Sequence, residues 1–168
     1  MVKVIFLGLN RVKVEYLTSK QLKHEAKKHN INIEDDSEVG NYSTILSHVT
    51  IGYGSTVGHS STIGSYSTLG SNSTIGSYST VEDNAIVGIE STLGSYSTLG
   101  SNSTLGRGST LGDNSTLGDN SKIGRNTRVY KGSHIGSRCN IGNNLIFYKR
   151  LELEDGCSID HKSQNKRI

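Results

Sequence analysis

The chain has 168 residues, of which 32% are hydrophobic, with no Pro, no Trp and a formal charge of +3, so it makes at most one ordinary domain. Leu, Ile, Val and Phe make up about 24% of the residues, whereas Gly, Ser and Thr account for 59. This composition borders on the disordered and low-complexity classes. No apolar run reaches the ~20 residues that cross a bilayer, and the first residues lack the features of a signal peptide. We therefore expect a soluble, cytoplasmic protein without a membrane partner.

Residues 1–32 precede any repeat and predict a small cap. Two strands are expected at Val2–Leu7 and Arg11–Leu17, joined by a short turn. A capping box at Thr18–Gln21 predicts a helix that runs to about Asn30. Such a ββα unit would cover the open first coil of a repeat structure and hide its edge. An oligomerisation or partner-binding element is the alternative interpretation.

A strict six-residue period then occupies residues 33–159. Every sixth residue from Ile33 to Ile159 is apolar, at all 22 positions and without an insertion. Internal repeats of this kind decide the architecture of a chain. If the apolar residue is position one, position two is mostly Gly, position five is small and mostly Ser, and position six is mostly Thr. Positions three and four carry pairs such as Ser-Asn, Asp-Asn and Lys-Gly, which are typical of corners with positive φ.

This pattern resembles the bacterial transferase hexapeptide repeat over about three quarters of the chain. The resemblance implies a mainly β fold, a left-handed parallel β-helix of about seven 18-residue coils with three hexads per coil. Residues 18 apart would then stack at the ~4.8 Å spacing of neighbouring strands. One large and one small inward side chain per hexad make a thin core that needs few hydrophobic residues. We expect a cap at 1–32, the β-helix at 33–159 and a polar tail at 160–168.

Charge is segregated along the chain. Residues 1–32 sum to +5, residues 33–118 to −7 and residues 119–168 to +5. Basic ends can attract a small anionic ligand such as a nucleotide or CoA. The acidic middle and the lack of a nucleic-acid motif argue against duplex nucleic acid as a partner. None of the His residues has the spacing of metal ligands, so no metal site is expected.

One column of outward residues, spaced by 18, changes its chemistry in the last coils. It is Thr from Thr44 to Thr116 and then becomes His134 and Glu152. A His beside a carboxylate suits general-base work. Acyltransferases of the superfamily that the chain resembles use a His near a subunit boundary to deprotonate the acceptor, which makes His134 the catalytic candidate and Glu152 its orienting partner. The alternative is a surface His in place of Thr, and the extruded loop of many such enzymes is absent from the unbroken hexads.

A second group of candidates marks a ligand site or a subunit contact. A column of Gly on another face ends in Tyr130 and Tyr148, next to Arg128 and Ile146. Aromatic faces beside Arg and Lys suit a stacked base with phosphates, or an interface. The basic residues at nearby corners are Arg107, Arg125, Lys131, Lys149 and Arg150.

Two further pairs stand 18 residues apart. Cys139 and Cys157 are both at position five, within reach of a disulfide. In a cytoplasmic chain we expect free thiols that serve as small core residues. Tyr78 is expected to stack under Tyr96 at a corner.

Three classes of function are open. The first, which the unbroken repeat favours, is a non-catalytic protein, trimeric as the resembled family usually is, that needs no cofactor and holds a small anionic, nucleotide-like ligand or a protein partner. The second is an O- or N-acyltransferase that uses acetyl-CoA to acylate a sugar or nucleotide sugar. The third is an ice-binding protein, although the outward pattern is Thr-x-Gly rather than Thr-x-Thr.

Overall fold

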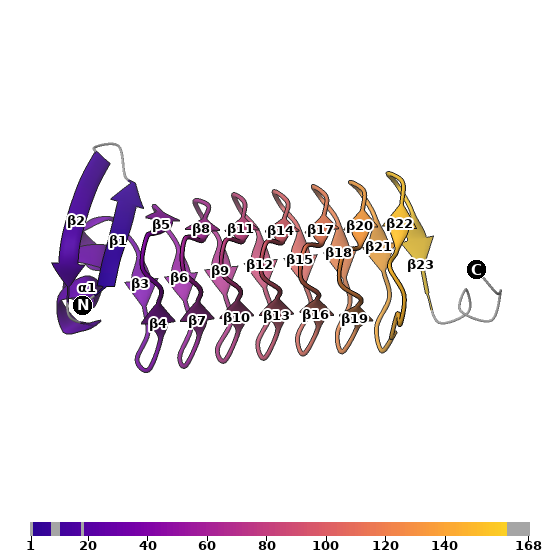
Figure 1. The fold of residues 1–168 in the computed structure, drawn as a ribbon, viewed down its shortest axis with the longest axis horizontal. Coiled ribbons are helices and arrows are strands. Elements are labelled where there is room, and N and C mark those ends of the chain that lie inside the picture. The colour runs from indigo at the N-terminus through magenta and orange to yellow at the C-terminus, as the bar shows by residue number, and fades with distance from the viewer. Residues whose placement is uncertain (1, 8–10, 18, 161–168) are drawn as a thin grey trace.

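The computed structural model describes residues 2–7, 11–17 and 19–160, with side chains from residue 21 onward. These residues form a β-solenoid of about 7 turns, with two strands and one helix at its N-terminal end (Figure 1). The predicted mainly β architecture is confirmed. The turn expected at residues 8–10, Thr18 of the capping box and residues 161–168 of the tail lie outside the described residues.

Each coil contributes a short strand to three sheets, which we call sheets A, B and C. Sheet A of the solenoid contains β5 (Ser43–Leu46), β8 (Thr62–Ile63), β11 (Thr80–Val81), β14 (Thr98–Leu99), β17 (Thr116–Leu117), β20 (His134–Ile135) and β22 (Glu152–Leu153). Sheet B contains β3 (Asn32–Ile33), β6 (Thr50–Ile51), β9 (Thr68–Leu69), β12 (Ile86–Val87), β15 (Thr104–Leu105), β18 (Lys122–Ile123), β21 (Asn140–Ile141) and β23 (Ser158–Ile159). Sheet C contains β4 (Glu38–Val39), β7 (Thr56–Val57), β10 (Thr74–Ile75), β13 (Thr92–Leu93), β16 (Thr110–Leu111) and β19 (Arg128–Val129).

Each strand of the solenoid pairs in parallel with the strand of the next coil, so that each residue lies opposite the residue 18 positions later. Thr98 pairs with Thr116, for example, and Thr104 with Lys122. Sheet C departs from this rule after β19, where a single bridge joins Arg128 and Ile146. Figure 1 shows the result, because the last coil continues the rows of sheets A and B but has no strand beyond β19.

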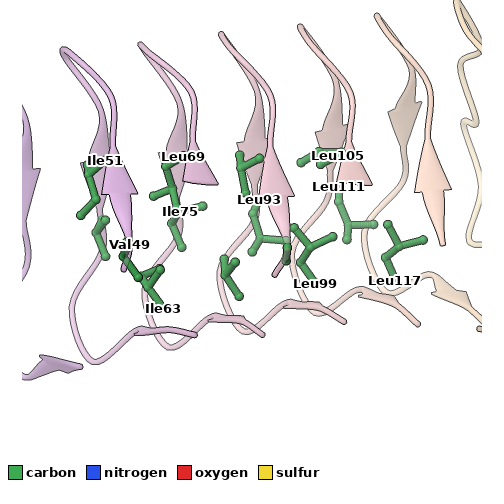
Figure 2. Packing of buried hydrophobic residues seen from close by; sticks show 14 of the residues in the cluster. Val49, Ile51, Ile63, Leu69, Ile75, Leu93, Leu99, Leu105, Leu111 and Leu117 are labelled. Atoms are coloured by element: carbon green, nitrogen blue, oxygen red, sulfur yellow. The ribbon is translucent and has the colours of Figure 1, made fainter. Parts of the chain in front are cut away.

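The first residue of each hexad builds a narrow core along the solenoid axis. Figure 2 shows part of it, a row of Ile, Leu and Val side chains from neighbouring coils that pack against one another. All 22 of these residues are buried except Phe147 and Leu153, which are only partly buried. The expectation of an unbroken buried column is therefore wrong in the last coil. Each buried aliphatic side chain contributes about 1.5 to 3 kcal/mol before entropy is counted, so a thin core suffices.

Buried Ser hydroxyls at position five are satisfied by the backbone, as the inward pattern requires. Ser79 Oγ donates to Gly94 O at 2.7 Å and accepts from Ser97 N at 3.2 Å. The next Ser, Ser97, repeats this by donating to Gly112 O at 2.9 Å. These hydroxyls join each coil to the next, so they add cohesion to the stack.

Corner residues at position four adopt the left-handed conformation, as expected. Asn102 has φ of 58° and Tyr96 of 57°. The Tyr78 and Tyr96 rings stack at this kind of corner, with centroids 5.0 Å apart, which confirms that pair.

The N-terminal elements cover the first coil. β1 (Val2–Leu7) pairs antiparallel with β2 (Arg11–Leu17) and in parallel with β5, so it extends sheet A at its open edge. α1 (Ser19–Lys28) buries Leu22 and Ala26, four residues apart, against the end of the core. Lys23 Nζ lies 2.6 Å from the Asp35 carboxylate and holds the pKa of Asp35 below its usual value. Among the described residues no helix is long and apolar enough to cross a membrane.

Candidate functional site

A pocket of about 410 Å³ lies on sheet C, over the C-terminal coils. Its floor is the outward face of β13, β16 and β19, and its C-terminal wall is the segment that follows Leu145. Three large side chains in it are exposed: Tyr130 at 42%, Ile146 at 43% and Tyr148 at 79%. The full lining is Thr92, Gly94, Thr110, Leu111, Gly112, Asp113, Arg128, Val129, Tyr130, Lys131, Ile146, Phe147 and Tyr148.

The pocket borders a place where the regular coil opens, which we call the open corner (residues 147–150). In the preceding coil Gly112 N donates to Val129 O at 3.1 Å. Tyr130 N stands one coil later in the same column, yet it has no acceptor among the residues that the structure describes. The strand bond that would tie Tyr130 to Phe147 is therefore missing.

Two more bonds of the regular coil are lost at the open corner. Gly132 N donates to Asp113 O at 2.8 Å, but the equivalent donor one coil later, Arg150 N, makes no such bond. Arg150 also lacks the positive φ that corner residues adopt in the other coils. Ser133 Oγ turns back to Tyr130 O at 2.6 Å, whereas Ser at this position elsewhere reaches the next coil. Regular pairing resumes where His134 N donates to Leu151 O at 2.8 Å.

The opening has a steric cause in the Gly column. A Cβ added to Gly94 would lie 2.4 Å from Asp113 N, and one added to Gly112 would lie 2.7 Å from Lys131 N. Side chains at position two therefore collide with the coil that follows.

One non-Gly residue in such a column is tolerated. Glu82 keeps its bond to Leu99 O at 2.9 Å where Gly100 occupies position two of the next coil. Tyr130 and Tyr148 are the one case, from residue 34 to 160, in which two successive coils both lack Gly there. The last coil stays bonded to β19 through Arg128 N and Leu145 O at 2.8 Å and through Phe147 N and Arg128 O at 2.9 Å. We infer that the double replacement separates the two coils only after these bonds, between Tyr130 and the open corner.

The ligand-binding candidates divide into two groups. Arg128, Tyr130, Lys131, Ile146 and Tyr148 all line the pocket, so the structure brings them together as the column analysis predicted. The role of these residues stays a prediction.

The other basic candidates lie at corners on either side of sheet C. Lys149 and Arg150 belong to the open corner, next to the pocket lining. Arg107 and Arg125 lie on the opposite edge of sheet C, and Arg107 Nη2 is 3.3 Å from the Glu90 carboxylate. Exposed pairs of this kind contribute little to stability, so Arg107 is free to exchange partners.

His134 and Glu152 are neighbours, as predicted. They pair in register in sheet A, and both side chains are exposed. The Glu152 carboxylate forms an ion pair with Arg150, however, and no bond to His134 is present among the described contacts. Both lie on a different sheet from the pocket, and within one chain the ion pair between Glu152 and Arg150 is the contact that joins the two groups of candidates.

The remaining candidate chemistry is sparse. Both cysteines are free, Cys139 buried and Cys157 partly buried. Burial raises the pKa of the Cys139 thiol. In the described part of the chain no cluster of three His, Cys, Asp or Glu residues is placed to hold a metal ion.

Comparison with protein families is consistent with this geometry. The profile described as bacterial transferase hexapeptide (six repeats) matches residues 114–148. The profile described as hexapeptide repeat of succinyl-transferase matches residues 92–120. The chain is a hexapeptide-repeat protein. A search of curated protein sequences finds no significant match.

Solved structures with the same fold include several acyltransferases. A variant of GDP-perosamine N-acetyl transferase from Caulobacter crescentus, solved with CoA and GDP-perosamine, is 16% identical with a TM-score of 0.55, over 83% of this chain and 59% of that one. The acetyltransferase domain of PglB from Neisseria gonorrhoeae, solved with acetyl coenzyme A, is 17% identical with a TM-score of 0.33, over 83% and 60%. UDP-N-acetylglucosamine acyltransferase from Campylobacter jejuni is 17% identical with a TM-score of 0.36, over 73% and 67%. The likeness to the first of these structures shows the fold alone, and this hexapeptide-repeat chain spans about 59% of it.

The structure also contains a feature that the hexad pattern did not reveal. A hollow of about 500 Å³ at the N-terminal end of sheet C is lined by residues from α1 and the first coils. In it His59 Nδ1 accepts a hydrogen bond from Asn41 N at 3.1 Å, so the neutral ring presents Nε2–H to solvent. One feature of the sequence could have indicated this contact. His59 is at position three of its hexad, where an acceptor side chain can bond to a backbone N–H of the coil before.

Proposed function

We propose that this hexapeptide-repeat protein is an acyltransferase that binds acyl-CoA in the pocket on sheet C and passes the acyl group to an amino or hydroxyl group of a sugar-type acceptor. The observation that carries the proposal is the pocket itself. It joins two Tyr rings with Arg128 and Lys131, in a chain whose fold is similar to that of the acyltransferase solved with CoA and GDP-perosamine. Aromatic faces bind planar rings, and Arg and Lys bind phosphate groups.

The chemistry of transfer needs a base, and His134 is our candidate. Its imidazole would take the proton from the acceptor N–H or O–H while the acceptor nitrogen or oxygen attacks the thioester carbonyl carbon. The C–S bond then breaks, and the CoA thiolate receives the proton from the imidazolium. The exposed position of His134 on sheet A leaves the ring accessible to an acceptor.

A trimer would bring the two groups of candidates together. Because His134 lies on sheet A and the pocket on sheet C, one chain does not place the base beside the acyl donor. We propose that sheet A of one subunit faces sheet C of the next, as expected for a three-sided prism in a closed ring. The trimer and a cytoplasmic location are predictions from the sequence.

A second candidate function is ligand binding without catalysis. It is favoured by the ion pair between Glu152 and Arg150, which occupies the carboxylate that would orient His134. The hexad frame from 33 to 159 also has no inserted loop. Ice binding stays a prediction that rests on the rows of Thr alone.

Single-turnover acetyl transfer separates these functions. The protein is mixed with radiolabelled acetyl-CoA and a panel of amino sugars and nucleotide sugars, and labelled acceptor is measured for the native chain and for His134→Ala. We expect transfer by the native chain and a loss of about 100-fold or more in the variant, the size of a general-base contribution. CoA affinity, measured by calorimetry, should be unchanged in His134→Ala and reduced in Arg128→Ala. Tight CoA binding without transfer in either protein would leave the binding function and remove the enzymatic one.

A further inference from the structure

Position three of the hexad has a structural role that the open corner interrupts. From Asp83 onward, each Asp or Asn at this position caps a backbone N–H of the coil before, whereas Asp113 N, which faces Lys131 in the next coil, has no such cap. Ser95 N donates to Asp113 Oδ1 at 2.8 Å, and Arg125 N donates to Asn143 Oδ1 at 2.7 Å. The acceptor in both cases comes from the residue 18 positions later, so these N–H groups point toward the next coil.

Lys149 stands where the cap of Lys131 N would come from. A Lys side chain has donors and no acceptor, and Lys131 N has no acceptor among the described residues. The neighbouring Tyr130 N is also without one, because its strand bond is missing. Two consecutive N–H groups are therefore left open toward the gap between β19 and the open corner, and Gly132 follows them with φ of 71°.

The charges around this gap are mainly positive. The cations Arg128 and Lys131 line the adjoining pocket. Lys149 follows the pocket residue Tyr148 at the open corner. The Asp113 carboxylate is the acidic group in the pocket lining, and one of its oxygens already accepts the Ser95 N–H. Arg150 is paired with Glu152. Successive free N–H groups beside cations make an anion-binding concavity.

We propose that the open corner binds a phosphoryl group through the backbone N–H groups of Tyr130 and Lys131, with the Lys131 and Lys149 ammonium groups as counter-ions. This inference deepens the proposed function and rests on it, because the same ligand places its planar ring against Tyr130 and Tyr148 and its phosphoryl group in the gap. The ligand class is a nucleoside with a phosphate or diphosphate. The missing strand bond of Tyr130 N and the two Lys side chains occur together at this corner.

The test uses inorganic pyrophosphate as the probe and two variants of Lys149. Amide shifts of the ¹⁵N-labelled protein are followed during the titration, and affinity is measured by calorimetry. We expect the Tyr130 and Lys131 amides to shift most. Lys149→Met removes the charge and should weaken binding about fivefold. Lys149→Asn removes the same charge and also supplies a side-chain oxygen that can accept the Lys131 N–H, as Asn143 does for Arg125 N. That N–H is then no longer open to the ligand, so binding should weaken about fivefold more.

Equal affinities of Lys149→Asn and Lys149→Met, or amide shifts confined to other residues, would overturn the proposal. ADP serves as the second probe, and we expect it to bind at least tenfold more tightly than pyrophosphate because its base adds ring stacking. Equal affinity for the two probes would overturn the nucleoside part. Failure of the proposed function would give a different result. Pyrophosphate would still bind and shift the Tyr130 and Lys131 amide signals, but no sugar acceptor would become acetylated. If the protein transfers acetyl groups but the two Lys149 variants bind pyrophosphate equally, the proposed enzymatic function stands and the phosphoryl site at the Tyr130 and Lys131 amides is rejected.

Discussion

The regular coils and the open corner are built from the same hexad, yet they differ in how tightly neighbouring coils approach. Around Gly94 the coils lie so close that a Cβ would be 2.4 Å from the next backbone nitrogen. At the open corner, Tyr130 N has no acceptor among the described residues and Phe147 is only partly buried. A solenoid of this kind is held together by contacts between nearest neighbours, so one altered column changes one contact and leaves the rest intact.

Under the proposed function, this contrast would explain how a rigid repeat acquires a site. Where the column is Gly, successive coils pack closely and present no large side chain. Two Tyr residues in that column, at positions 130 and 148, separate the coils, expose their rings and free backbone donors. A few substitutions in the repeat thus supply shape, aromatic surface and hydrogen-bond donors together.

The largest effect is expected from the core. Leu99→Ala, in a fully buried position of sheet A, should reduce the free energy of unfolding by about 3 kcal/mol. Phe147→Ala, at the open corner, should cost about 1 kcal/mol because its side chain is only partly buried. Urea denaturation of the two variants measures the difference. Equal losses would mean that the last coil is packed like the others.

The next effect concerns the Gly column. Gly94→Ala should destabilise the protein by about 2 kcal/mol, since its Cβ would force neighbouring coils apart. Gly142→Ala is the matched control, because its Cβ would lie 3.2 Å from Ile159 O, with room to adjust, and we expect a cost below about 1 kcal/mol. Thermal denaturation compares them. A larger loss for Gly142→Ala would contradict the steric account.

Removal of one Tyr should close the open corner. In Tyr148→Gly the open corner can approach Tyr130, so Tyr130 N regains a carbonyl acceptor and its hydrogen exchange should slow about fivefold. The pocket should shrink and CoA binding should weaken. Tyr66→Gly, which removes an exposed ring in an earlier coil outside the pocket lining, is the control and should leave exchange at Tyr130 unchanged. Unaltered exchange in Tyr148→Gly would show that the Tyr pair does not hold the corner open.

The smallest effect distinguishes the two thiols. Cys139 is buried and burial raises its pKa, so at neutral pH little reactive thiolate is present. Cys157, in the last coil, is partly exposed. Iodoacetamide should therefore modify Cys157 several times faster, as peptide mass spectrometry can follow. Faster modification of Cys139 would indicate that the coil containing it opens more readily than the end of the solenoid.

Much of the fold was predictable because position one is apolar at every sixth residue. That period alone places Leu69 and Leu105 in the core, both fully buried. The three hexads per coil that the family resemblance implies then pair His134 with Glu152 in register. The patch at Tyr130 and Tyr148 was also predictable, since it breaks the Gly column. Phe147 was not, because its position in the hexad is the same as that of the buried residues, and only the displacement of its coil leaves it partly exposed.

The repeat pattern did not predict which side chains form ion pairs or hydrogen bonds with one another. Columns place Glu152 next to His134 and equally near Arg150, and the choice of Arg150 depends on the path that the chain takes through the open corner. The free N–H groups of Tyr130 and Lys131 follow from the same path.

The sequence by itself determined the period, the three faces and the residues that stack in each column, because a six-residue repeat without insertions leaves one register for burial of its apolar positions. The tertiary structure alone decided how closely successive coils approach, since that distance depends on which atoms meet across the gap. The pocket, the partly exposed Phe147 and the open backbone donor of Tyr130 all result from that second factor, where Tyr148 follows Tyr130 in the Gly column.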